Sequence, residues 1–276
     1  MRKTTGSMVC PNCRKLIGVG EKNCPFCGAW NPGLFGYAPA LQRLFGGRLD
    51  LIHIIVVACV GLYVAALVLQ PEAIFKVQGF LGILSPGNRA LYQLGMTGGY
   101  AWEQRWWWTL FTAIFLHGGI LHIVFNVLWI RNLGPMVERT YGPARAFIIF
   151  MLSGAIGFVV SNLASGAPTL GASGSIFGLL AALIVYGRKH GGQEITGQLW
   201  QWAIIMFAMG FMMSGVNNWA HAGGFAGGWL TATAMRFEHE KRESALLQVL
   251  ALALLALTAA GVVLSFVRVT SILLLR

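Results

Sequence analysis

Three apolar segments of this sequence carry side chains that could do chemistry away from water. The segment LGASGSIFGLL holds Ser173 among small residues, and NNWAHAGGFAGGW holds His221 ahead of several glycines. A third segment, LFTAIFLHGGILHIVFNVLWI, holds His122 and Asn126, which are four residues apart and so share one helical face. A serine hydroxyl within hydrogen-bond reach of an imidazole forms a nucleophile with its general base. The three segments therefore predict acyl-transfer chemistry, provided that the fold brings them together.

The composition indicates that these segments lie in a membrane. Of the 276 residues, 56% are hydrophobic and 11% are charged, with a mean hydropathy of +0.66, whereas about a quarter of the residues of a soluble domain are charged. The polar N-terminus predicts no cleaved signal peptide. Seven apolar segments approach the length that a spanning helix needs, and the short fourth and fifth are typical of helices buried among others. The seven cover 51–70, 109–130, 144–163, 172–187, 199–214, 220–236 and 246–267.

The basic residues predict the orientation of these spans. With the N-terminus in the cytoplasm, fifteen of the twenty lysines and arginines fall on the inner side. The formal charge of +11 is therefore a topology signal, and nucleic acid is not expected as a partner. We expect a multi-pass protein of a bacterial inner (plasma) membrane, with its C-terminus outside. Ser173 and His221 then both lie near the outer ends of their spans and share a depth.

No carboxylate accompanies the serine and the histidine at that depth. All nine acidic residues lie outside the second to sixth apolar segments, so a Ser-His-Asp triad is not available there. A serine and a histidine can still act as a pair if another group orients the imidazole. Phe177, one helical turn after Ser173, is placed to do so by packing. Taken singly, however, such a serine is usually a packing residue, and such a histidine is often a core residue or part of a proton path.

Four of the five cysteines form two Cys-x-x-Cys pairs near the N-terminus. Such pairs on either side of a short hairpin can present four thiolates tetrahedrally, which favours zinc, with rubredoxin-like iron as the main competitor. A cytoplasmic location disfavours disulfides. We expect a structural zinc-ribbon-like module over residues 1–30, followed by a linker or interfacial segment over 31–50. The sequence does not decide whether the module binds a cytoplasmic partner. The four predicted ligands are Cys10, Cys13, Cys24 and Cys27.

Together, the segments HGGILHIVFN, GASGSIFG and AHAGGFAGG resemble the rhomboid family of intramembrane serine proteases. The resemblance covers residues 51–236 and implies an all-α, polytopic membrane bundle with a six-helix core. The seventh span, over 246–267, is similar to an extra C-terminal helix of some members. The four-cysteine head resembles an accessory found on some members.

The resemblance also implies residue roles. Ser173 matches the nucleophile and His221 the general base, while His122 and Asn126 match the oxyanion-hole side chains beside the backbone N–H of Ser173. The supporting positions that it implies are His117 for the first loop, Gly171 and Gly174 for the G-x-S-G turn, Phe177, and Gly224 and Gly228 for the glycine face of the histidine helix. There is one departure: Trp108 is followed by Thr109, where the family usually has an arginine.

These observations predict an intramembrane serine endopeptidase with a Ser173-His221 dyad and no catalytic cofactor. Its expected partners are the lipid bilayer and membrane proteins with a transmembrane helix, cut in or near that helix. The alternative is a non-catalytic rhomboid-like adaptor that binds client helices without cutting them. A solute or proton transporter is less favoured, because neither an acidic relay nor inverted repeats are visible.

Overall fold

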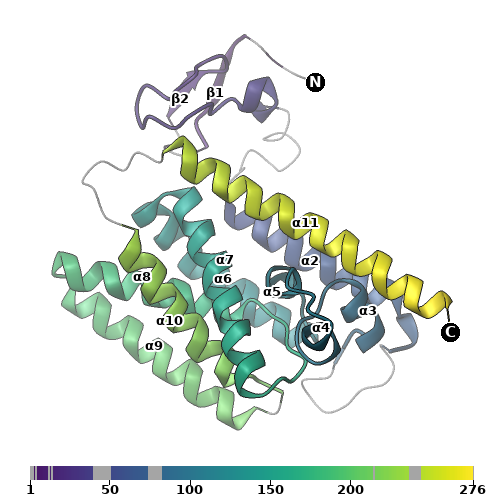
Figure 1. Ribbon diagram of the computed structural model, residues 1–276. Helices are drawn as coiled ribbons and strands as arrows, with labels where there is room; N and C mark the ends of the chain where they lie inside the picture. Colours follow the sequence, from purple (N-terminus) through teal and green to yellow (C-terminus); the bar gives the residue numbers. More distant parts are fainter. Residues whose placement is uncertain are drawn as a thin grey trace.

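The protein is a bundle of long helices with a small two-stranded head (Figure 1). The computed structural model describes residues 3, 5–11, 13, 15–39, 51–73, 83–213, 215–235 and 244–275. Each of the seven apolar segments overlaps one long helix in this described part, which confirms the all-α helical bundle. The helices are α2 (Leu51–Leu69), α6 (Ile120–Tyr141), α7 (Pro143–Ala164), α8 (Ser173–His190), α9 (Gln193–Met212), α10 (Asn218–Ala234) and α11 (Ala245–Leu274).

Among the described residues, five helices are long and apolar enough to cross a membrane: α2, α6, α7, α9 and α11. The two helices that carry Ser173 and His221 fall outside this set. Helix α10 has 17 residues, and α8 ends in three basic residues. Every residue of α8 from Gly174 to Val185 is buried, so α8 is an inner helix whose surroundings are other helices, as its short apolar segment predicts.

The prediction for the fifth segment was wrong, because α9 is not a buried helix. Its buried residues are Thr196, Leu199, Ala203 and Gly210, which are spaced along one face. Large apolar side chains such as Ile204 and Phe211 are exposed. Helix α9 therefore contacts the bundle through one narrow face, and most of its surface is exposed.

The second predicted span, over 109–130, was also wrong in its bounds. Helix α5 (Thr109–Thr112) continues into the 3-10 turn η4 (Ala113–Phe115), which ends at Leu116 in extended backbone. The spanning helix α6 begins only at Ile120 and runs to Tyr141. Gly118 and Gly119 lie at the break. Apart from proline, glycine has the lowest helix propensity of all residues, which favours a break here. Because the segment is apolar on both sides of this break, hydropathy alone does not reveal it.

Glycines let three inner helices approach closely. A Cβ atom at Gly224 of α10 would overlap the backbone of Gly174 in α8, and one at Gly228 would overlap the backbone of Gly178. Helix α7 approaches α10 as closely, since a Cβ at Gly157 of α7 would lie 2.5 Å from the backbone oxygen of Ala220. Small residues at helix crossings allow such backbone contact in membrane bundles. The result is a tight unit of α7, α8 and α10.

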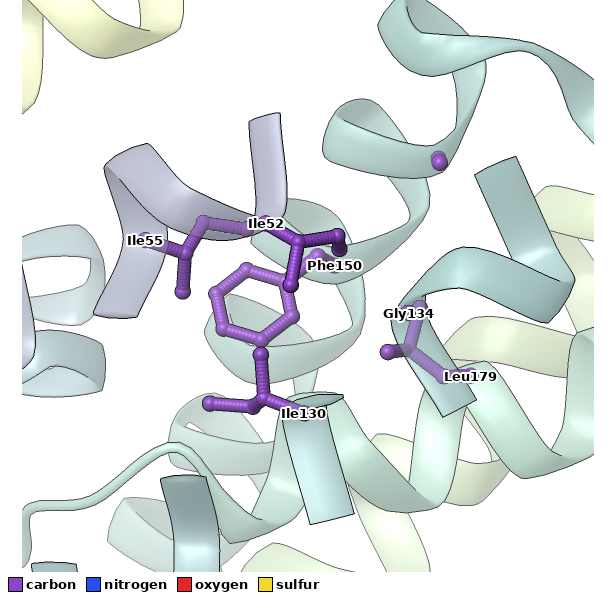
Figure 2. Close-up of a pocket in the computed structure, with 7 residues that line it drawn as sticks. Ile52, Ile55, Ile130, Gly134, Phe150 and Leu179 are labelled. Carbon is purple, nitrogen blue, oxygen red and sulfur yellow. The ribbon is translucent and has the colours of Figure 1, made fainter. Parts of the chain in front are cut away.

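Helix α2 packs on the bundle through an apolar contact with α6 and α7. Figure 2 shows Ile52 and Ile55 of α2 next to Ile130 and Phe150. A Cβ at Gly134 of α6 would overlap the side chain of Ile52, so the glycine permits this approach. The residues that line the small gap between the helices are all apolar. The gap therefore belongs to the core and offers no polar group to a ligand.

The connection between α2 and α6 contains the turn η2 (Pro71–Ala73), α3 (Asn88–Gln93), α4 (Tyr100–Glu103) and α5. We call residues 83–119 the first loop. Helix α11 packs against α3, α5 and α7 and so lies beside this loop (Figure 1).

The head contains one hairpin. Strands β1 (Ser7–Val9) and β2 (Leu16–Gly18) pair antiparallel, and the 3-10 turn η1 (Leu34–Gly36) follows. Met8 and Ile17 point into a small core that also contains Ala29 and Ala38. The folded head therefore includes residues that the sequence assigns to the linker, and residues 40–50 of that linker lie outside the described residues.

Candidate active site and metal centre

The first residue of α8 and a buried residue of α10 form a direct contact. The Nε2 atom of His221 lies 2.9 Å from the Oγ atom of Ser173. This distance is that of a hydrogen bond, in which the hydroxyl can donate to the imidazole. Two residues 48 positions apart in the chain are thus brought into the relationship that general-base activation of a hydroxyl requires.

Two groups hold the imidazole of His221 in place. The ring of Phe177 stacks on it, with centroids 4.6 Å apart and an angle of 23° between the planes. The Oδ1 atom of Asn218 lies 3.2 Å from Nδ1. If Nδ1–H donates to this oxygen, Nε2 carries the lone pair that faces Ser173. Phe177 is predicted by the sequence, whereas Asn218 was missed, although its position one turn before His221 is a readable signal.

The start of α10 is tied to the segment that precedes Ser173. The side-chain oxygen of Asn217 accepts hydrogen bonds from the backbone N–H groups of Trp219 and Ala220 at 3.1 and 3.3 Å, which caps the helix. Its amide nitrogen lies 2.7 Å from Ser161 Oγ and 3.0 Å from Thr169 Oγ1. Asn217, which is partly buried, thus links α10, the end of α7 and the approach to Ser173.

Gly171 brings the backbone close to His122. Its φ of +118° lies in the region that favours glycine, and a Cβ there would lie 2.6 Å from His122 Nε2. The backbone N–H of Gly118 donates to His122 Nδ1 at 3.3 Å, so the ring proton of a neutral His122 lies on Nε2, on the side of Gly171. This places a donor next to the G-x-S-G turn.

The other two predicted polar residues of this segment, His117 and Asn126, are more buried than His122. The Nδ2 atom of Asn126 donates to the backbone oxygen of His122 at 2.8 Å, so its amide is engaged with its own helix. The ring of His117 meets that of His122 edge-on, with centroids 5.1 Å apart. Its two ring nitrogens are buried without a hydrogen-bond partner among the described residues. His117 thus contacts the site through His122.

An apolar groove of about 430 Å³ opens between α9 and α10 and reaches His221. His221 and Phe177 form one end of its lining. The other residues that line it are Trp200, Ala203, Ile204, Phe207, Ala208, Phe211, Ala222 and Phe225. The groove can therefore receive apolar groups directly beside the imidazole.

The four cysteines of the head form a second candidate site. Their Sγ atoms all lie within 4.8 Å of one another, with Cys10 and Cys27 3.8 Å apart and Cys13 and Cys24 3.6 Å apart. In the described part of the chain, none of the four is in a disulfide. Tetrahedral Zn–S bonds of about 2.3 Å place the sulfurs about 3.8 Å apart. The four thiols therefore form a site of the right size for a metal ion.

The surroundings of Cys24 favour its thiolate. Burial opposes ionisation, but hydrogen bonds from the backbone N–H groups of Cys27 and Phe26 and from the neighbouring thiols outweigh it. Together they lower the pKa of Cys24 to about 7. A thiolate is the form that binds a metal.

The fold and the site define a polytopic helical membrane protein with a serine–histidine pair inside the bundle. A model of the Rhomboid domain matches residues 104–238, which include all the candidate residues of this pair and its surroundings but neither the head nor α11. The chain belongs to the rhomboid family.

Three relatives show the extent of the likeness. The rhomboid protease GluP of Bacillus subtilis is 39% identical over 132 residues, which are 47% of this chain and 26% of GluP. The rhomboid-family protein YdcA of the same organism is 31% identical over 156 residues, which are 55% of this chain and 75% of YdcA. Rhomboid-type serine protease 2 of Emericella nidulans is 33% identical over 147 residues, which are 50% of this chain and 29% of the fungal protein. The relatives' names support membership of a serine protease family, and the chain spans less than a third of GluP and of the fungal protein.

Proposed function

We propose that this protein is an intramembrane serine endopeptidase in which Ser173 is the nucleophile and His221 the general base. The observation that carries the proposal is the 2.9 Å contact between His221 Nε2 and Ser173 Oγ. In the first step, Nε2 takes the hydroxyl proton as Oγ bonds to the scissile carbonyl carbon. The imidazolium then gives that proton to the leaving amine as the C–N bond breaks. Water, activated by the same imidazole, hydrolyses the acyl-enzyme.

The negative charge that develops on the carbonyl oxygen needs donors. Ser173 is the first residue of α8, so its backbone N–H is one of those that a helix leaves unpaired. The Nε2–H of His122, on the Gly171 side, is the second donor. Asn126 becomes the third if its amide leaves the backbone oxygen of His122, which it contacts at 2.8 Å. All three are neutral donors, which suits a site enclosed by apolar helices.

The proposed substrates are membrane proteins with a transmembrane helix. An intact helix keeps its carbonyls hydrogen-bonded, so the segment to be cut must unwind before Ser173 can reach it. The groove between α9 and α10 supports apolar substrates, because it brings apolar surface up to His221. The excess of basic residues on one side further supports cytoplasmic placement of the N-terminus, with the dyad near the outer face.

Reconstitution tests this proposal. The full-length protein in liposomes is expected to cut a co-reconstituted single-span substrate within or next to its transmembrane segment, and EDTA is expected to leave the rate unchanged. Mass spectrometry of the products locates the cut. Intact substrate in every lipid and substrate combination, together with an unreactive Ser173, would favour the non-catalytic adaptor.

The proposed oxyanion donors predict a specific kinetic change. His122→Ala and Asn126→Ala are each expected to lower kcat by about 10²–10³-fold with little change in KM, because the lost donor acts mainly in the transition state. Asn132→Ala is the control, since Asn132 is exposed on the same helix. Steady-state kinetics in liposomes measure the effect. A loss confined to KM, or one below about threefold, would remove that residue from the oxyanion hole.

For the head we propose a structural zinc ion held by Cys10, Cys13, Cys24 and Cys27. Elemental analysis of the purified protein is expected to give one zinc per chain, lost in Cys24→Ser, while Cys59→Ala in α2 keeps it. Cys24→Ser should still cut the model substrate, because the ion has no part in the reaction. Iron in place of zinc, with the visible absorbance of ferric thiolate, would contradict the assignment.

A further inference from the structure

Helix α11 lies outside the residues that the rhomboid model matches, yet it packs directly against the first loop (Figure 1). Its buried residues are Thr258, Gly261 and Ser265, which fall on one helical face. A Cβ at Gly261 would lie 2.9 Å from the side chain of Thr112 and 3.2 Å from that of Trp108. The helix therefore touches the first loop through a narrow face of small residues and shows apolar side chains elsewhere.

Trp108 is the centre of this contact. Its Nε1–H donates to Ser265 Oγ at 2.8 Å, and the guanidinium of Arg268 lies over its ring, 5.3 Å from the centroid. This is cation–π geometry. The cation beside Trp108 therefore comes from α11, the helix that carries Arg268.

A second polar contact joins the same helix to the same loop. The amide nitrogen of Gln93, in α3, lies 3.1 Å from Thr270 Oγ1. Gln93 is buried, so this bond satisfies an amide that water does not reach. Helix α11 therefore holds the first loop at two places, one on each side of Gly95.

The first loop in turn holds the backbone that leads to Ser173. Thr97 and Thr169 exchange backbone hydrogen bonds of 3.3 and 2.8 Å, as neighbouring strands do. Thr112 Oγ1 donates to the backbone oxygen of Gly95 at 2.6 Å, close to this pair. The N–H of Gly171, two residues before Ser173, donates to the backbone oxygen of Ala113 at 2.9 Å. Moving the first loop therefore moves the G-x-S-G turn.

We propose that α11 is a positioning element of the active site: Ser265 and Arg268 fix Trp108, and through the first loop they keep the turn before Ser173 in register with His221. The effect on cleavage rests on the proposed function, whereas the effect on the loop does not. Helix α11 is then part of the catalytic unit and not only an additional membrane anchor.

The test compares variants of the full-length protein in liposomes. Ser265→Ala combined with Arg268→Ala is expected to lower kcat for a single-span substrate by about tenfold, because small displacements of reacting groups are costly, with KM within about twofold. Hydrogen exchange of the backbone amides over 95–99 and 166–171 should become faster in the same variant. Arg268→Lys, which keeps the cation, should restore most of the loss of Arg268→Ala. Ser271→Ala is the control, since this hydroxyl bonds within α11 to the oxygen of Val267.

The readouts separate the outcomes. Unchanged exchange over 166–171 in the double variant overturns the inference, as does a lower melting temperature with kcat per folded molecule unchanged. Faster exchange in a protein whose wild type does not cut supports the positioning role and counts against the proposed function. If the double variant does not fold, Ser265→Ala alone is expected to show the same changes at about threefold in kcat, consistent with the loss of one hydrogen bond.

Discussion

Ser173→Ala is expected to lower kcat for a membrane substrate by about 10⁴-fold or more, because it removes the atom that bonds to the scissile carbonyl. The cavity left by one hydroxyl oxygen is small and lies at the partly accessible first position of α8. The fold should therefore be unchanged, with a melting temperature within about 2 °C of wild type. Cleavage in liposomes and thermal unfolding of the same preparations measure both quantities.

Ser175 provides a matched control for this prediction. It lies two residues further along α8, is fully buried, and its Oγ atom has no hydrogen-bond partner among the described residues. Because an unpaired buried hydroxyl is unfavourable, Ser175→Ala should leave kcat unchanged and the protein equally or slightly more stable. Equal losses of activity in the two variants would mean that the serines matter for packing and not for chemistry.

Gly224→Ala and Gly228→Ala are expected to lower both the activity and the stability of the protein. A Cβ at either position would overlap the backbone of α8, at Gly174 and at Gly178. Backbone atoms cannot rotate aside as a side chain does, so α10 must move away from α8. His221 moves with it, which should lower kcat by about 100-fold or more. The overlap should also lower the free energy of unfolding by about 1–3 kcal/mol.

A third glycine shows whether the close approach causes this loss. Gly197 lies in α9, and a Cβ there would meet no atom within 4 Å. Gly197→Ala should therefore keep full activity and gain stability from its higher helix propensity. The kcat and the free energy of unfolding of the three alanine variants show whether the loss of activity depends on the contact between α8 and α10. Wild-type activity in Gly224→Ala would show that the α8–α10 contact is not required for the dyad.

The sequence predicts the parts of the site that depend on residue type and spacing. Ser173 and His221 lie in glycine-rich motifs. The same glycines that make these motifs recognisable in the sequence also allow α8 and α10 to pack backbone against backbone. Phe177 follows from helical spacing. The two Cys-x-x-Cys pairs likewise place four thiols together, since each pair forms a local turn.

Other features depend on tertiary context that a single segment does not contain. The break before α6 lies inside a continuous apolar run, so hydropathy does not mark it. Helix α9 is apolar enough to span a membrane although most of its own surface is exposed, so its composition does not show how it packs. The contact of Arg268 with Trp108 joins residues that lie far apart in the sequence. Asn218 is different, because its spacing from His221 is visible in the sequence, and only the 3.2 Å contact with Nδ1 gives it a role.

The central claim is that Ser173 is a nucleophile activated by His221. The most direct measurement is the reaction of the purified protein with a fluorophosphonate, followed by mass spectrometry of the labelled peptide, because it needs no knowledge of the substrate. We expect one adduct, on Ser173, that is absent in Ser173→Ala and forms at least about 100-fold more slowly in His221→Ala. No adduct, an adduct on another serine, or labelling of Ser173 at the same rate without His221 would contradict the claim.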